Sequence, residues 1–133
     1  MSEQSPKQDT TPGIVSWNEL ASNDVAGSRQ FYSQLFGWNI EEMQMPAGTY
    51  SFLKAGDRPV GGLLQMPPEA KGAPTMWMPY ITVADLRQAI AKATSLGGKL
   101  CKDATTIPEM GSFAILNDPQ GATFGLWEFA RKG

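Results

Sequence analysis

The chain has 133 residues, of which 41% are hydrophobic and 18% charged, and its formal net charge is −2. One domain of this length buries roughly 68% of its unfolded surface, so its core needs no disulfide framework. Histidine is absent, which excludes Ser-His-Asp and Cys-His nucleophiles, zincin motifs and imidazole acid-base chemistry, and the scattered lysines and arginines predict no nucleic-acid binding.

Residues 1–12 are polar and lack the apolar stretch of a signal peptide, so they are expected to form a disordered lead-in. No segment approaches the roughly 18 apolar residues of a membrane helix, which predicts a soluble protein with no membrane partner. Cys101 is the single cysteine, and this suits a reducing, cytoplasmic compartment. Without a histidine to activate it, Cys101 is expected to be an inert core residue.

The segment 13–66 is expected to form a strand, a helix and three further strands. The first strand covers residues 14–21, and Asp24 then suits the N-cap of a helix that ends at Gly37. The three strands are predicted, from their apolar pattern and bounding turn residues, over 38–45, 50–55 and 60–66. The connection 66–75 is rich in proline and glycine, shows no apolar periodicity, and is the expected linker.

The segment 76–129 is expected to have the same order of elements. Asp85 suits the N-cap of a second helix, and Gly97 ends it. The strands are predicted over 76–83, 99–105, 112–117 and 122–129.

The two segments repeat each other at an offset of 61 residues. Asp24 reappears as Asp85, and the turn residue Asp57 reappears as Asp118. An internal repeat indicates one supersecondary unit that is used twice. Two copies are too few for a solenoid, so the copies are expected to face each other around a shared cleft.

A set of short motifs carries a resemblance to a known superfamily. In chain order they are Trp17, Phe31-Tyr32, Leu35-Phe36-Gly37-Trp38, Gly61-Gly62 and Asn117-Asp118-Pro119-Gln120-Gly121. At these spacings the chain resembles the vicinal oxygen chelate superfamily, which contains glyoxalase I, bleomycin-resistance proteins and extradiol dioxygenases. The resemblance implies an α+β fold for residues 13–133, in which two βαβββ modules (13–66 and 76–129) form a curled, cup-shaped mixed sheet with the site on its concave face.

The resemblance also implies where metal ligands lie in metal-dependent members. The four positions correspond to Trp17, Leu64, Met78 and Gly125. None of these residues offers a carboxylate or imidazole to a divalent ion, so no metal and no cofactor are expected.

The same positions are expected to line a pocket for a ligand. Glu19 lies two residues after Trp17 and therefore on the same strand face, Tyr80 is its counterpart at the repeat offset, and Gly62 and Gly125 are expected to leave open space. The predicted ligand-binding residues are Trp17, Glu19, Leu64, Met78, Tyr80, Gly125 and Trp127. Pro79 cannot donate a ladder hydrogen bond, so the facing of its two neighbours stays open.

Three functions remain possible from the sequence. The first is a metal-free protein that binds a small apolar or aromatic molecule, with Glu19 as the polar anchor. The second is an enzyme of the superfamily, a lyase, isomerase or dioxygenase, either metal-free with Glu19 as catalytic base or with metal ligands at other positions. The third is a structural module whose cup is filled by its own side chains. A homodimer is expected, because members of the superfamily commonly complete each cup with modules from two chains, and the linker 66–75 permits this.

Overall fold

The computed structural model describes residues 9–45, 48–70 and 72–130. Residues 1–8 of the expected lead-in lie outside the described residues. The elements are β1 (Val15–Ser22), α1 (Val25–Phe36), β2 (Asn39–Met45), β3 (Gly48–Ala55), β4 (Arg58–Gln65), the 3-10 helix η1 (Pro68–Ala70), β5 (Met76–Thr82), α2 (Leu86–Ser95), β6 (Lys99–Ile107), β7 (Gly111–Asn117) and β8 (Thr123–Phe129). The order βαβββ is confirmed in both halves, and the turn of 3-10 helix within the connection was not predicted.

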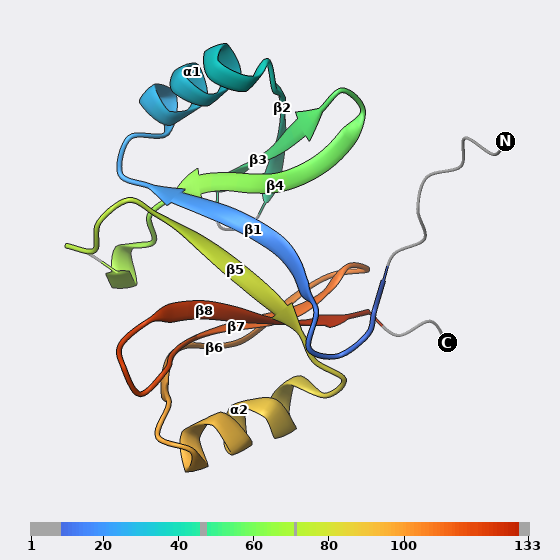
Figure 1. Cartoon of the computed structure of the whole chain (residues 1–133), viewed down its shortest axis with the longest axis vertical. Coiled ribbons are helices and arrows are strands. Elements are labelled where there is room, and N and C mark those ends of the chain that lie inside the picture. Colours follow the sequence, from blue (N-terminus) through green and yellow to red (C-terminus); the bar gives the residue numbers. More distant parts are fainter. Residues whose placement is uncertain (1–8, 46–47, 71, 131–133) are drawn as a thin grey trace, which may run out of the picture. The chain divides into compact units, whose positions relative to one another are not determined.

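The chain divides into two compact units, which we call the N-terminal unit (residues 17–79) and the C-terminal unit (residues 80 onward with the described residues up to 16). In the N-terminal unit the strand order is β2-β3-β4-β1, and only β1 and β4 are parallel. In the C-terminal unit the order is β5-β8-β7-β6, and only β5 and β8 are parallel. Each unit therefore has a mixed sheet, and one helix lies along one face of it (Figure 1).

The expected signals define both ends of α1. The carboxylate of Asp24 accepts a hydrogen bond from the backbone N–H of Gly27 at 3.0 Å, which satisfies one of the free donors of the first turn. At the other end Gly37 has a φ of 71° and donates its N–H to the carbonyl of Ser33. Only glycine adopts this left-handed conformation readily, so the helix stops there.

Two carboxylates cap the beginning of α2. Asp85 accepts from the N–H of Gln88 at 3.0 Å, as its position predicts. Glu128, on β8, accepts from the N–H of Leu86 at 2.7 Å. The second contact ties the helix to the sheet of its own unit and could not be predicted from local sequence, because Glu128 is 42 residues away.

Each unit has its own hydrophobic core between the helix and the sheet. The core of the N-terminal unit consists of Leu20, Leu53 and Leu63, with Val25, Tyr32, Trp38, Ile40 and Val60 packed against them. The core of the C-terminal unit consists of Leu86, Ala114, Leu116 and Leu126, with six partly buried hydrophobic residues around them. Fully burying one leucine contributes roughly 1.5–3 kcal/mol, so these clusters hold each helix on its sheet.

Cys101 is not a core residue. It lies on β6, as predicted, but its side chain is exposed. β6 is the last strand in the order of the C-terminal unit, and its pairing with β7 shifts register between Leu100 and Lys102. The expected burial of Cys101 is therefore wrong, because strand periodicity does not report which strand lies at an edge. No helix in the described part of the chain is long and apolar enough to cross a membrane.

Candidate functional site

In the N-terminal unit, one sheet face is covered by α1 and the other is not. The three core leucines face α1, so strand alternation directs their sequence neighbours to the helix-free face. The register places Glu19 on β1 and Phe52 on β3 next to the same residue of β4, Gly62. Side chains from three strands therefore meet on the helix-free face around Gly62.

A buried chain of hydrogen bonds lies on this face. The indole Nε1–H of Trp17 donates to the hydroxyl of Tyr50 at 2.8 Å, and that hydroxyl is hydrogen-bonded to the carboxylate of Glu19. The side chain of Glu19 is buried, with only 7% of its surface exposed. We refer to these three residues as the Glu19 cluster.

Electrostatics fix the protonation state of Tyr50 in the Glu19 cluster. Burial raises the pKa of Tyr50 far above its usual range, and the negative charge of Glu19 raises it further. The hydrogen bond from Trp17 favours the phenolate and opposes these effects only in part. Tyr50 therefore keeps its proton across physiological pH and donates it to the carboxylate.

Aromatic packing occupies the space that the sequence analysis expected to be open above Gly62. A Cβ atom on Gly62 would overlap the hydroxyl of Tyr50, so the glycine makes room for the phenol ring. Phe52 packs edge-on against Tyr50 and Trp17, with ring centroids 5.1 and 6.3 Å apart. A ligand on this face would contact aromatic rings, not the backbone of β4.

The corresponding space in the C-terminal unit is also filled. A Cβ atom on Gly125 would overlap the ring of Tyr80, which is 5% exposed and packs edge-on against Phe113 with centroids 6.1 Å apart. Trp127 packs against Phe129 at 5.9 Å. The expectation of open space at the two glycines is therefore wrong in both units, because a tyrosine ring covers each of them.

The register also corrects the equivalence between the last strands of the two repeats. Glu19 pairs with Gly62, and its counterpart Tyr80 pairs with Gly125. Gly62 is therefore the structural equivalent of Gly125, whereas the constant offset of 61 had assigned Leu64. A glycine and a leucine are equally unable to ligate a metal, so the correction leaves the donor set unchanged.

The predicted metal positions do not fit a metal ion. They present an indole, an isobutyl group, a thioether and a glycine hydrogen, and none is a ligand for hard or borderline divalent ions. Across residues 9–45, 48–70 and 72–130, no three carboxylate or thiol side chains cluster in a way that could hold a metal.

Pro79 does not break the alternation of β5. The strand continues from Met76 to Thr82, and its alternate residues Met78, Tyr80 and Thr82 are all at most 5% exposed. Met78 lies in the N-terminal unit and Tyr80 in the C-terminal unit. The seven predicted site residues thus form two groups: Trp17, Glu19, Leu64 and Met78 in the first unit, and Tyr80, Gly125 and Trp127 in the second.

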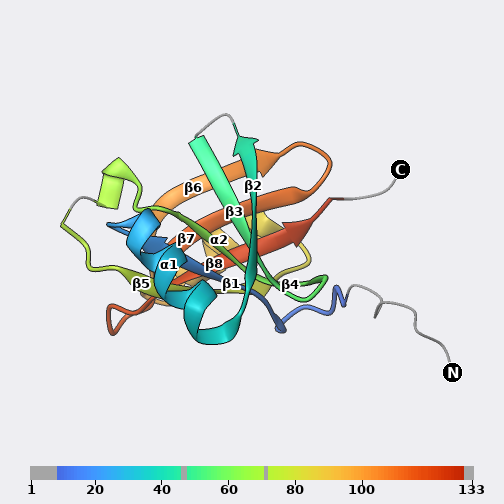
Figure 2. The same ribbon diagram turned by 90° about the horizontal axis from the view of Figure 1, so that it is seen from above.

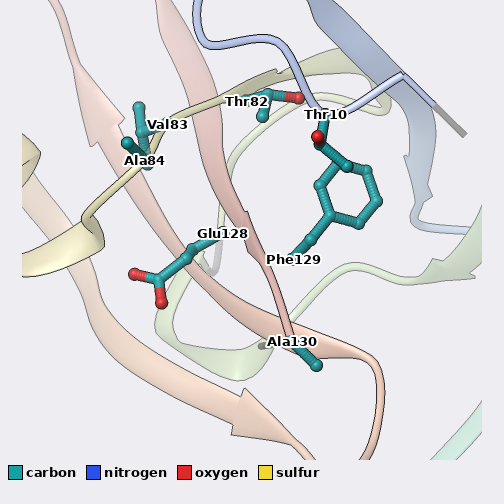
Figure 3. A pocket seen from close by; sticks show the side chains of 7 residues that line it. All are labelled: Thr10, Thr82, Val83, Ala84, Glu128, Phe129 and Ala130. Carbon is teal, nitrogen blue, oxygen red and sulfur yellow. The ribbon is translucent and has the colours of Figure 1, made fainter. Parts of the chain in front are cut away.

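Two shallow clefts lie in the C-terminal unit, away from every predicted site residue. One, of about 240 Å³, is lined by Thr10, Thr82, Val83, Ala84, Glu128, Phe129 and Ala130 (Figure 3). The other, of about 270 Å³, is lined by Asp85, Leu86, Arg87, Ala104, Thr106, Ser112 and Glu128. Glu128 contributes to both, but its carboxylate already caps α2, which gives it a structural role.

Tyr50 was missed by the sequence analysis. The strand over residues 50–55 was predicted, and its alternation already places Tyr50 and Phe52 on one face. The missing information was the pairing that brings Tyr50 over Gly62, since strand register depends on residues distant in sequence.

Comparisons with known proteins agree with the resemblance seen in the motifs. Residues 18–127 match the Glyoxalase-like domain family. The chain is 38% identical over 115 residues to the putative glyoxylase CFP32 of Mycobacterium tuberculosis, which covers 86% of this chain and 43% of that protein. It is 28% identical over 135 residues to the anthracycline biosynthesis protein DnrV of Streptomyces peucetius, covering 92% and 48%. The chain thus spans about half the length of these two relatives.

A solved structure supports the fold. A glyoxalase/bleomycin resistance protein/dioxygenase superfamily member from Vibrio splendidus superposes with a TM-score of 0.54 at 16% identity, over 84% of this chain and 96% of that one. Sequence family and fold lead to the same assignment: the chain belongs to the glyoxalase-like family of the glyoxalase/bleomycin resistance/dioxygenase, or vicinal oxygen chelate, superfamily.

Proposed function

We propose that the protein binds a small aromatic or amphipathic molecule on the helix-free face of the N-terminal unit, with Glu19 as the polar anchor and without a metal ion. The observation that carries the proposal is the Glu19 cluster. A buried carboxylate is costly unless it is hydrogen-bonded, and the core of this unit, on the other face of the sheet, does not use it. Its position is better explained by recognition than by folding.

The chemistry of the Glu19 cluster favours a ligand that has both an aromatic ring and a hydrogen-bond donor. A carboxylate accepts up to about four hydrogen bonds, so Glu19 can accept one from a ligand in addition to the bond from Tyr50. Trp17 and Phe52 supply faces and edges for a planar ring. One relative is named for anthracycline biosynthesis, and a polycyclic aromatic ligand would suit these walls.

A second candidate is a metal-free isomerase or lyase in which Glu19 is the base. The observation that favours it is the contact between a carboxylate and a phenol that keeps its proton. Such a pair can remove a proton from one atom of a substrate and donate one to another. One relative carries the name putative glyoxylase, which is consistent with an enzyme.

The experiment that tests both candidates is a titration with a panel of planar aromatic carbonyl and phenol compounds, with tryptophan fluorescence and thermal shift as readouts. We expect quenching that is reduced at least about tenfold in apparent affinity by Trp17→Ala and Glu19→Gln. Glu42→Gln is the matched control, because Glu42 is exposed and lies outside the cluster. Elemental analysis of the same sample is expected to find no stoichiometric transition metal.

The outcomes separate the hypotheses. Ligand binding without turnover supports the binding protein. Turnover that Glu19→Gln abolishes while binding persists supports the enzyme. One tightly held metal per chain, or a panel without any hit, contradicts the proposed function and favours the metalloenzyme or the filled structural module.

A further inference from the structure

The outer side of α1 carries an exposed apolar surface. Its exposed members are Phe31, Leu35, Phe36 and Trp77, with 58%, 57%, 56% and 40% of their surface accessible. Together with the half-buried Tyr32 and Trp38 we call them the α1 surface. Single exposed hydrophobic residues are ordinary, but six neighbouring ones are not.

The rings of the α1 surface form one continuous cluster. Tyr32 lies at its centre, with ring centroids 4.9 Å from Phe31, 5.4 Å from Trp77 and 6.2 Å from Phe36. The hydroxyl of Tyr32 accepts a hydrogen bond from the indole N–H of Trp77 at 3.1 Å. Trp38 completes the cluster through Phe36, 4.9 Å away. The side chains are thus held in place as a preformed surface.

The fold does not require this surface, as the second repeat shows. At the offset of 61 residues, Phe31 and Phe36 correspond to Lys92 and Gly97. The C-terminal unit forms the same βαβββ arrangement with these residues. The apolar residues of α1 therefore need an explanation other than folding of the unit.

Contacts on the inner side of α1 sharpen the contrast. Ser28 is hydrogen-bonded to Ser22 through their hydroxyls at 2.7 Å. Arg29 reaches the hydroxyl of Ser51 and pairs with Glu42. Polar side chains thus make part of the contact with the sheet, while apolar ones project outward. Figure 2 shows α1 in front of the strands of its unit, with this outer side toward the viewer.

We infer that the α1 surface is the interface through which a second copy of this chain binds. A two-fold interface places identical residues opposite each other, so it favours surfaces without unpaired charge. Within α1 the only charged residue is Arg29, and it is paired with Glu42. The exposed polar residues Gln30 and Gln34 each carry a donor and an acceptor, so they can bond to their own symmetry mates.

The charge pattern of α2 argues against the equivalent pairing there. Arg87 and Lys92 are exposed on that helix, and a two-fold axis would bring like charges together. Leu96 is 68% exposed but has no aromatic neighbours on the helix.

The area of the α1 surface suits the centre of a dimer interface. Large apolar side chains bury roughly 150–250 Å², so four that are about half exposed supply on the order of 400 Å² per copy. A standard interface covers about 800 Å² per partner, of which a polar rim makes up the remainder. A contiguous apolar patch of this size is often a functional surface.

Sedimentation velocity between about 1 and 100 μM, with a reductant because Cys101 is exposed, tests the proposal. We expect a species near twice the 14.4 kDa chain mass. Phe31→Ser and Leu35→Ser are each expected to weaken dimerisation at least about tenfold, as truncation of a central apolar contact does. Leu96→Ser is the matched control, because Leu96 is the repeat counterpart of Leu35, and it is expected to leave the dimer unchanged.

Thermal unfolding of each variant at a concentration where all are monomeric separates lost binding from lost folding. Midpoints close to wild type are expected, since the replaced side chains are exposed. A wild-type monomer over the whole range overturns the inference, as does a dimer that Phe31→Ser leaves intact. A monomer whose tryptophan emission shifts on addition of phosphatidylcholine vesicles would assign the surface to a membrane and would equally overturn it.

Discussion

The two βαβββ units share their order of elements and their strand connections but differ in the chemistry of both faces. On the helix-free face, the N-terminal unit has a buried carboxylate hydrogen-bonded to Tyr50, whereas the C-terminal unit has Tyr80 packed against Phe113. On the helix side, α1 exposes aromatic residues and α2 exposes charged ones. Since both residue sets support one topology, the residues that differ are those released from the demands of folding. They are the ones to test for function.

The largest effect is expected from adding a methyl group under each tyrosine. Gly125→Ala would place a Cβ against the base of the Tyr80 ring, which cannot swing away, and we expect a loss of about 3 kcal/mol in the free energy of unfolding. Gly62→Ala would meet only the far end of Tyr50, so a smaller loss of about 2 kcal/mol is expected. Urea denaturation measures both.

A double variant checks the origin of the Gly62 effect. Combined with Tyr50→Ala, the Gly62→Ala change should cost much less than it does alone, because the overlapping hydroxyl is gone. Additive losses would show that the two residues do not compete for the same space.

Tyr50→Phe is expected to lower the free energy of unfolding by about 2 kcal/mol. The change removes the hydroxyl that accepts from Trp17 and donates to the buried Glu19, and bonds to charged groups are worth roughly 1.5–3 kcal/mol. Tyr32→Phe is the control, since its hydroxyl belongs to a half-exposed pair with Trp77. Equal losses for the two variants would contradict a special role of the Glu19 cluster.

Stability above pH 10 should depend on Tyr50. The pKa of Tyr50 is raised in the folded state, so its contribution is fully present below the unfolded value of 10.0 and is lost as pH rises above it. Over that range the unfolded chain releases a proton that the folded chain retains, which lowers the free energy of unfolding by about 1.4 kcal/mol per pH unit. Urea denaturation from pH 8 to 11 should show a steeper decline for wild type than for Tyr50→Phe. Parallel curves would mean that Tyr50 is not the group responsible.

Local signals in the sequence were sufficient to predict the elements. Asp24, Gly37 and Asp85 act within a few residues of where they stand, so helix ends could be assigned from the chain alone. The superfamily could be recognised for the same reason, because its motifs follow turns and helix ends. The fold was therefore largely predictable.

The arrangement of the candidate site was less predictable, because it depends on strand pairing. The β3–β4 hairpin turns directly from Ala55 to Arg58, whereas the β7–β8 turn runs from Asn117 to Thr123. This difference, together with the register shift in the first hairpin, moves the last strands out of a constant offset. A pattern read at fixed spacing could not locate Gly62, nor the Tyr50 ring above it.

The smallest effect is expected from making α1 resemble α2 on its inner side. Arg29 corresponds to Ile90 at the repeat offset, and Ile90 packs against the core of its own unit. Arg29→Ile removes the ion pair with Glu42, but both side chains are exposed to 37% and 46%, and pairs at such exposure contribute about 0–1 kcal/mol. We expect the free energy of unfolding to change by less than about 1 kcal/mol and to become less sensitive to NaCl. A larger loss would show that α1 is held on its sheet mainly by this pair, and the contrast with the apolar attachment of α2 would then extend to the way each unit is stabilised.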